Sequence, residues 1–252
     1  MTEPPTFEVI PLGTGDFIAI KRYPTALLLV ADGRSVLVDC PEPLFRMCAE
    51  SSEMSGREID LRLIDDIVLT HLHGDHCNGL EAFAFWRRFV AQRQARPHIY
   101  TSREAAGSLW ARLAPAMAES TMLDSRSFRR YELSDYYEVT SFDFGRTFRV
   151  AGIEFETRRT LHTIPCFGFR ASFRGRTFGY SSDTAFDPDL IRFLEPCDLV
   201  FHETGGGIHT PLKDLEALPR EMQEKMRLIH LPDEFPGSAQ IETAEAGHIY
   251  PV

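Results

Sequence analysis

The sequence predicts an α/β protein in which two mixed β-sheets form a sandwich and helices cover both outer faces. Short aliphatic or β-branched runs recur in both halves of the chain, and each ends in turn residues. Helical patterns lie between these runs, from Gly79 to Gln92 and from Ser102 to Glu119. Two strand-rich halves with helices outside them match an αββα sandwich.

The predicted strands follow one another without a separating linker. Those of the first half are FEVIPLGTG from Phe7, ALLLVADG from Ala26, SVLVDC from Ser35 and DDIVLTHLH from Asp65. Those of the second half are TFRVAG from Thr147, IEFETRR from Ile153, FGFRASFRG from Phe167, RTFGYSSD from Arg176, DLVFHE from Asp198 and MRLIHL from Met226. Glycine-containing turns between several of them are typical of hairpins. We therefore expect a single domain over residues 1–252.

Composition excludes some classes of partner. The formal net charge is −10, so we expect no binding to extended nucleic acid. Eight arginines have two interpretations, a local basic rim or scattered solvated charge, and we prefer the second for most of them. These arginines are Arg126, Arg129, Arg130, Arg158, Arg159, Arg170, Arg174 and Arg176.

Cysteine usage and the amino terminus indicate the compartment. The five cysteines form no C-x-x-C pair, which argues against a disulfide framework or a thiolate zinc site and favours a reducing cytoplasm. The start of the chain has no basic residues followed by a long apolar stretch, and the run ALLLVA is much shorter than a membrane span. We expect a soluble, unprocessed protein with no membrane partner.

The strongest chemical signal is the run HLHGDH. His71 and His73 alternate in an extended segment after the buried-looking strand IVLT, so both point the same way and can hold one ion. Asp75 and His76 follow in the turn into the next helix, where they can face a second ion. Gly74 is expected to give that turn its conformational freedom. The alternative is a His-rich surface loop.

Further ligand types follow later strands, as two metal shells require. His162 comes after IEFETRRTL, Asp183 ends RTFGYSSD and His230 ends MRLIH. One histidine at such a place is most often a hydrogen-bonding loop residue. Because three candidates in a row follow an HxHxDH run, we prefer metal ligands over hydrogen-bonding loop residues here.

Motifs along nearly the whole chain resemble the ribonuclease Z branch of the metallo-β-lactamase superfamily. They are PLGTG from Pro11, VDC from Val38, HLHGDH, His162 followed by GFR, YSSDT from Tyr180, HET from His202, HT from His209 and LIHLP from Leu228. The resemblance implies the metallo-β-lactamase fold and two divalent metal ions. It assigns one ion to His71, His73 and His162, the other to Asp75, His76 and His230, and a bridging position to Asp183. Zinc is the usual ion of that branch, and the same ligand types also suit Mn or Fe.

Two adjacent ions would activate water and stabilise the charge that develops on a phosphoryl group, so we expect a phosphate ester to be hydrolysed. Asp75 is the first candidate for the general base. The resemblance implies that His209 contacts the phosphate and protonates the leaving oxygen, with Glu203 as the residue that orients it. His202 is preferred as a structural strand-end residue, and the run Gly205–Gly207 is either a hinge for His209 or a tight turn.

One departure from the family pattern decides the expected substrate. Ribonuclease Z enzymes carry a basic tRNA-binding arm between the third metal histidine and the bridging aspartate. Between His162 and Asp183 this chain has room only for two strands and a turn. The sequence therefore favours a small phosphodiester, such as a cyclic nucleotide, over tRNA 3′-processing. Enzymes of this branch without the arm include cyclic-nucleotide phosphodiesterases and phage proteins that destroy cyclic-nucleotide signals.

Other functions remain open at this stage. The second hypothesis is hydrolysis of a carboxylic ester, lactone or thioester, because activated water attacks an acyl carbon equally well. His209 and nearby arginines favour phosphate, whereas an apolar pocket without them favours an acyl group. A non-catalytic binding protein is disfavoured because all seven ligand positions are filled. An oxygen-reducing diiron protein is disfavoured because His73 stands where such proteins generally have a carboxylate.

The helix from Gly79 also predicts a homodimer. It carries Phe83, Phe85, Trp86 and Phe89, more aromatic surface than one helix face buries in its own core. Ribonuclease Z-like proteins are commonly dimers, so the resemblance implies the same.

Overall fold

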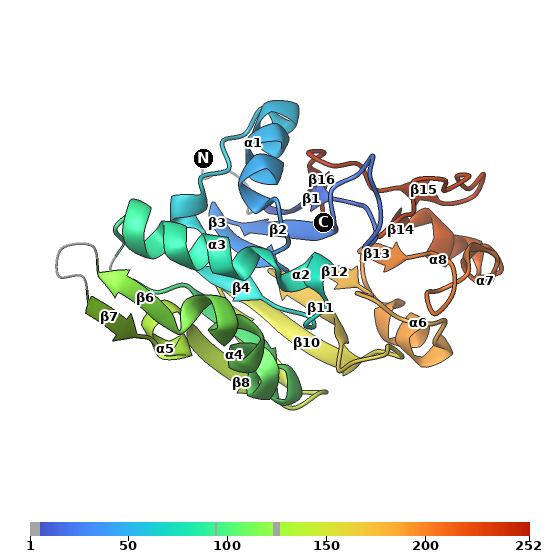
Figure 1. Ribbon diagram of the computed structural model, residues 1–252. Helices are drawn as coiled ribbons and strands as arrows, with labels where there is room; N and C mark the ends of the chain where they lie inside the picture. Colours follow the sequence, from blue (N-terminus) through green and yellow to red (C-terminus); the bar gives the residue numbers. More distant parts are fainter. Residues whose placement is uncertain (1–5, 94, 123–126) are drawn as a thin grey trace.

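Two seven-stranded β-sheets lie face to face in the computed structural model, which describes residues 6–93, 95–122 and 127–252. Helices lie outside the two sheets and so complete an αββα arrangement (Figure 1). The expected fold class is confirmed.

The first sheet has the strand order β16-β1-β2-β3-β4-β5-β8. Its strands are β1 (Phe7–Gly13), β2 (Ala26–Ala31), β3 (Arg34–Val38), β4 (Asp66–Val68), β5 (His98–Ser102), β8 (Glu138–Phe142) and β16 (Tyr250–Pro251). Antiparallel pairing joins β16, β1, β2 and β3, and parallel pairing joins β3, β4, β5 and β8. Helices α1 (Leu44–Ser55), α3 (Gly79–Phe85) and α4 (Arg103–Met117) pack on its outer face.

The second sheet has the order β15-β14-β13-β12-β11-β10-β9. Its strands are β9 (Thr147–Val150), β10 (Ile153–Arg159), β11 (Phe167–Phe173), β12 (Arg176–Tyr180), β13 (Leu199–Glu203), β14 (Met226–Ile229) and β15 (Glu242–Thr243). Its outer face is covered by α6 (Pro188–Leu194), α7 (Leu212–Glu216) and α8 (Arg220–Glu224). The remaining elements are short: η1 (Leu61–Leu63), α2 (Gly74–Cys77), η2 (Trp86–Val90), α5 (Leu133–Tyr136) and the hairpin β6 (Glu119–Met122) with β7 (Ser127–Arg130).

Strand β2 shows why the apolar runs are continuous. Leu27 and Leu29 point into the core between the sheets, where they join side chains such as Phe169 and Phe201. Leu28, on the opposite face, packs beneath the outer helices. A strand that is buried on both faces has no position for a polar side chain, so its sequence reads ALLLVA.

Some details differ from the sequence prediction. The helix from Gly79 continues as α3 only to Phe85, and a π-helical turn follows from Trp86 to Val90 (η2). Strands β5 and β8 were not predicted, because their sequences HIYTS and EVTSF are short and largely polar. No helix in the described ranges is long and apolar enough to cross a membrane.

Candidate functional site

The ends of five strands meet at one edge of the sandwich and carry the predicted site residues. The run HLHGDH follows β4, and its second half forms α2. His162 follows β10, Asp183 follows β12, Glu203 ends β13 and His230 follows β14. Parallel strands end at the same edge of a sheet, so residues far apart in the sequence converge there.

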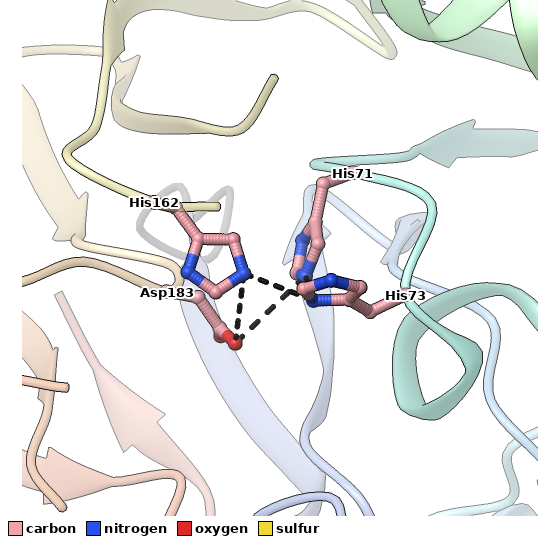
Figure 2. Close-up of side chains that lie close together, drawn as sticks. All are labelled: His71, His73, His162 and Asp183. Carbon is pink, nitrogen blue, oxygen red and sulfur yellow. Dashed lines mark hydrogen bonds and ion pairs between the residues drawn. The ribbon is translucent and has the colours of Figure 1, made fainter. Parts of the chain in front are cut away.

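The first group of donor atoms comprises His71, His73, His162 and Asp183. Figure 2 shows the three imidazoles pointing toward one another beside the carboxylate. Nε2 of His71 and Nε2 of His162 lie 3.2 and 2.9 Å from Nδ1 of His73. Oδ2 of Asp183 lies 3.8 Å from Nε2 of both His71 and His162. The structure therefore brings together the set that the resemblance assigned to one ion.

The second group comprises Asp75, His76, Asp183 and His230. Nε2 of His76 lies 3.3 Å from Oδ2 of Asp75 and 3.3 Å from Oδ1 of Asp183. Nε2 of His230 lies 3.3 Å from Oδ2 of Asp75 and 3.6 Å from Oδ2 of Asp183. Asp183 thus belongs to both groups, in the position expected of a bridging ligand.

These distances fit divalent cations. Metal–donor lengths of about 2.0–2.2 Å with tetrahedral angles put neighbouring donors about 3.3–3.6 Å apart. The four donor pairs of the second group span 3.3 to 3.6 Å. Nε2 of His76 and Oδ1 of Asp183 are also buried without a hydrogen-bond partner in the described structure. Buried polar atoms of this kind are unfavourable unless a ligand satisfies them, and a cation would do so.

The buried carboxylates govern the protonation of the imidazoles around them. Burial by itself lowers the pKa of His230, but Asp183, Asp75 and Glu203 outweigh it and raise that pKa to about 10. At His162 burial dominates and lowers the pKa to about 4. Because imidazole binds a metal in its neutral form, a cation in the second group has to displace a proton from His230.

Asp39 and Thr70 form a supporting network that the sequence reasoning missed. Nδ1 of His76 donates to Oδ2 of Asp39 (2.8 Å), and the Thr70 amide donates to Oδ1 of the same carboxylate (2.8 Å). The Thr70 hydroxyl also contacts Asp39, and it lies 3.0 Å from Nδ1 of His71. These contacts hold the Nδ1 side of both rings and turn Nε2 toward the donor groups. In the sequence, the only indication of Asp39 was its place in the motif VDC, to which no role was assigned.

His209 and Glu203 form a pair beside the donor groups. Nδ1 of His209 donates to Oε2 of the buried Glu203 (2.7 Å), and Oε1 of Glu203 accepts from the amide of Thr184. The hydrogen bond to Glu203 raises the pKa of His209 above its usual value, against the effect of burial. Since Nδ1 is engaged, Nε2 is the ring nitrogen left for a substrate.

Glycines shape two parts of this site. The Gly205 amide donates to the Thr210 carbonyl (3.1 Å), so the run Gly205–Gly207 forms a turn. Gly74 lies outside the left-handed backbone region, contrary to the expectation that its turn needs glycine torsions. A Cβ atom at Gly74 would lie 2.7 Å from Nδ2 of Asn78, so a larger residue there would displace the Asn78 side chain.

His202 lies outside both donor groups. It shares the outer face of its sheet with Val200 and Leu228, which pack beneath the covering helices. Its Nδ1 donates to the carbonyl of Glu203 (2.7 Å).

A cavity of about 510 Å³ opens over the donor groups. Its lining residues are Phe17, His73, Gly74, Asp75, Asn78, His162, Thr163, Asp183, Ile208 and His209, and none of them is an arginine or lysine. The described arginines proposed as a basic rim make other contacts: Arg129 lies over Tyr131, and ion pairs join Arg130 to Glu119, Arg158 to Asp189, Arg159 to Glu104, Arg170 to Glu156, Arg174 to Asp32 and Arg176 to Asp198. Arg126 lies outside the described residues. The rim interpretation is therefore wrong for this pocket.

Residues 7–250 match the sequence profile of the family described as anti-Pycsar protein Apyc1. The chain belongs to this family. The Apyc1 protein of Paenibacillus sp. (strain J14) is 31% identical over 235 residues, covering 89% of each protein. The chain is also 27% identical over 264 residues to the cGMP-dependent 3′,5′-cGMP phosphodiesterase A of Dictyostelium discoideum, covering 97% of this chain and 28% of that enzyme.

Solved structures place this Apyc1-family chain in the metallo-β-lactamase fold. The metallo-β-lactamase fold protein YhfI of Bacillus subtilis superposes with a TM-score of 0.75 at 18% identity, covering 99% of this chain and 100% of YhfI. Human tRNase Z, short form, gives a TM-score of 0.70 at 18% identity, with 96% and 98% coverage. The expected fold is confirmed. Only the hairpin β11–β12 lies between His162 and Asp183, so the arm is absent as expected.

Proposed function

We propose that this chain is a metal-dependent phosphodiesterase that hydrolyses a cyclic nucleotide. The observation that carries the proposal is the sharing of Asp183 by two donor groups beside the His209–Glu203 pair in one pocket. Relatives named anti-Pycsar protein Apyc1 and 3′,5′-cGMP phosphodiesterase support it.

The metal ligands are the seven residues of the two donor groups. Divalent ions bound there would supply positive charge for the phosphate and would activate water for attack. We propose zinc, because five imidazoles and two carboxylates make up the donor set, with Mn and Fe as the other candidates. The lining holds no arginine or lysine, so bound ions together with His209 would be the main positive partners of the phosphate.

Asp75 is the proposed general base. Burial by itself raises its pKa, but His230 and His76 hold that pKa far below its usual range, so Asp75 is a carboxylate. Oδ2 faces these two histidines, which leaves Oδ1 to accept a proton from the attacking water. Its place in the pocket lining supports contact with the reacting phosphate.

His209 is the proposed general acid. Opening a cyclic phosphate breaks a phosphorus–oxygen bond to the ribose, and the leaving alkoxide needs a proton. Glu203 orients the ring through Nδ1 and favours the imidazolium, so Nε2 can donate that proton.

One observation favours a second candidate, hydrolysis of an ester, lactone or thioester. The pocket includes the apolar side chains of Phe17 and Ile208 and no arginine. The proposed acid argues only against a thioester, because a thiolate leaves without a proton. The relative named 3′,5′-cGMP phosphodiesterase favours a phosphodiester over an ester or lactone.

A substrate panel tests the proposal. We expect metal-dependent turnover of 3′,5′-cyclic nucleotides, in comparison with 2′,3′-cyclic nucleotides, bis-nitrophenyl phosphate, lactones and thioesters. Metal analysis of the same preparation shows which ions are present. Faster turnover of a lactone or thioester than of every phosphodiester would refute it.

We further propose a homodimer, although part of the predicted aromatic surface is internal. Phe83 is fully buried, and Trp86 packs against Phe45 with ring centroids 5.4 Å apart. Phe89 and Val90 keep 48% and 69% exposure, and this exposed patch is the proposed contact.

Two other proposals concern the chain as a whole. Side chains from both sheets share the inner core, which supports one folding domain. The five cysteines are buried and unpaired, which supports a reducing, cytoplasmic location.

A further inference from the structure

Two exposed apolar side chains stand at the mouth of the catalytic pocket. Phe17 is 65% exposed and Ile208 is 49% exposed, and both line the cavity. They come from different parts of the chain: Phe17 from the segment between β1 and β2, and Ile208 from the turn that carries His209. Paired apolar groups beside a polar reaction centre are typical of a surface that binds part of a substrate.

The segment that carries Phe17 is held in place. The carboxylate of Asp233 accepts hydrogen bonds from the amides of Ile20 (2.8 Å) and Lys21 (2.9 Å). The Asp16 amide donates to the carbonyl of Leu231 (3.1 Å). In Figure 1 this segment reaches from the end of β1 to the region of β14. Because Leu231 and Asp233 lie one and three positions after His230, these bonds fix the Phe17 segment relative to the donor groups.

The pocket therefore has a polar part and an apolar part. Asp75, Asp183 and His209 lie in the polar part, which the proposed function assigns to the phosphate. Phe17 and Ile208 supply the apolar part. In a cyclic nucleotide the base is attached at C1′ and the phosphate joins O3′ and O5′ at the opposite end of the ribose, so a phosphate at the donor groups leaves the base to contact the apolar part.

We propose that Phe17 and Ile208 form the binding surface for the nucleobase, with the Phe17 ring stacked on it, and that Asp233 is a positioning residue for this surface. The inference rests on the proposed cyclic-nucleotide hydrolysis. Stacking suits this place because every base has an apolar π-face that an aromatic ring can cover.

The test compares two substrates in wild type and Phe17→Ala. One is 3′,5′-cyclic AMP, and the other is methyl riboside 3,5-cyclic phosphate, which has the same phosphate ring but no base. We expect Phe17→Ala to raise KM for cyclic AMP about tenfold with kcat unchanged, because loss of one stacking contact weakens binding by about that factor. Kinetics with the base-free substrate should not change. Phe17→Trp should keep the wild-type KM, and Ile20→Ala, in the same segment and 92% exposed, is the matched control.

Asp233→Asn tests the positioning role. It should raise KM for cyclic AMP in the same selective way, and it should speed hydrogen exchange at the amides of Ile20 and Lys21. Unchanged exchange at these amides would overturn the role of Asp233. If Phe17→Ala affects both substrates equally, or neither, the base surface is wrong although the phosphodiesterase stands. If wild type with bound metal hydrolyses neither substrate, the proposed function fails and this inference fails with it.

Discussion

Replacing Asp39 with asparagine should disturb the hydrogen bonds that orient the metal-binding histidines, while every proposed metal ligand stays in place. The oxygen Oδ1 can remain opposite the Thr70 amide and hydroxyl, at 2.8 and 3.0 Å. The new amide nitrogen then faces Nδ1 of His76, where Oδ2 accepts at 2.8 Å. Two donors cannot share that contact, so the His76 proton has to move to Nε2, the atom that faces Asp75 and Asp183.

The magnitude follows from this change of tautomer. A protonated Nε2 cannot bind a cation, and loss of such supporting contacts weakens metal affinity about ten- to hundredfold. This corresponds to about 1.4–2.7 kcal/mol. The first donor group should be affected much less, because it reaches Asp39 only through the Thr70 hydroxyl, which can keep its bond to Oδ1.

A zinc titration of metal-free protein against a chromophoric chelator measures both binding steps. We expect one weakened step in Asp39→Asn and two normal steps in Asp143→Asn, a control at an exposed carboxylate that pairs with Arg103. Thermal unfolding without metal verifies that the variant is folded. Two unchanged binding steps in folded Asp39→Asn would refute the reasoning.

The remaining predictions concern the metals, the acid and the dimer. Purified protein loaded with zinc or manganese should hold two ions per chain, as the donor groups indicate, and folded protein with only trace metal would contradict the assignment. His209→Ala should retain both ions but lose about a hundredfold in turnover of a cyclic nucleotide. Turnover of a nitrophenyl phosphate ester should fall much less, because its leaving group needs no proton. Wild-type rates with the cyclic nucleotide would show that His209 takes no part in the reaction, and loss of a metal would show that it is a ligand. Glu203 raises the pKa of His209, so the acid is present below that pKa and is lost as pH rises through it; the resulting alkaline decline in wild-type turnover should be missing from the pH profile of His209→Ala. Asp75→Ala should reduce turnover of both substrates, because the proposed base and a metal ligand are lost together. Light scattering at micromolar concentration should give a dimeric mass, and a monomeric mass would count against the proposed contact.

Sequence reasoning located the donor residues because each stands next to a recognisable strand. His162, Asp183 and His230 each come at or shortly after the end of a predicted strand, so their place at one edge of the sandwich follows from the fold class. Asp39 also follows such a strand, but its role depends on the parallel register that sets Val38 beside Val68. That register brings Asp39 to Thr70, and periodicity along one strand carries no information about it.

Other features depend on contacts that no local pattern records. Phe17 gave no signal, because its significance lies in its exposure at the pocket and in the bonds from its segment to Asp233. The absence of arginine from the pocket lining also follows from tertiary structure, since Arg158 and Arg159 are drawn to Asp189 and Glu104. Residue spacing alone does not determine such pairings.

The way in which the Phe17 segment is anchored bears on how this protein can evolve. Its bonds to Leu231 and Asp233 use main-chain amides of Asp16, Ile20 and Lys21, which most amino acids would provide equally well. The side chain of Phe17 extends from this frame, lines the pocket and is largely exposed. Mutations there can alter the surface offered to a ligand while the metal ligands stay under separate selection. Related chains are thus free to diverge in substrate preference through a few positions without rebuilding the reaction centre.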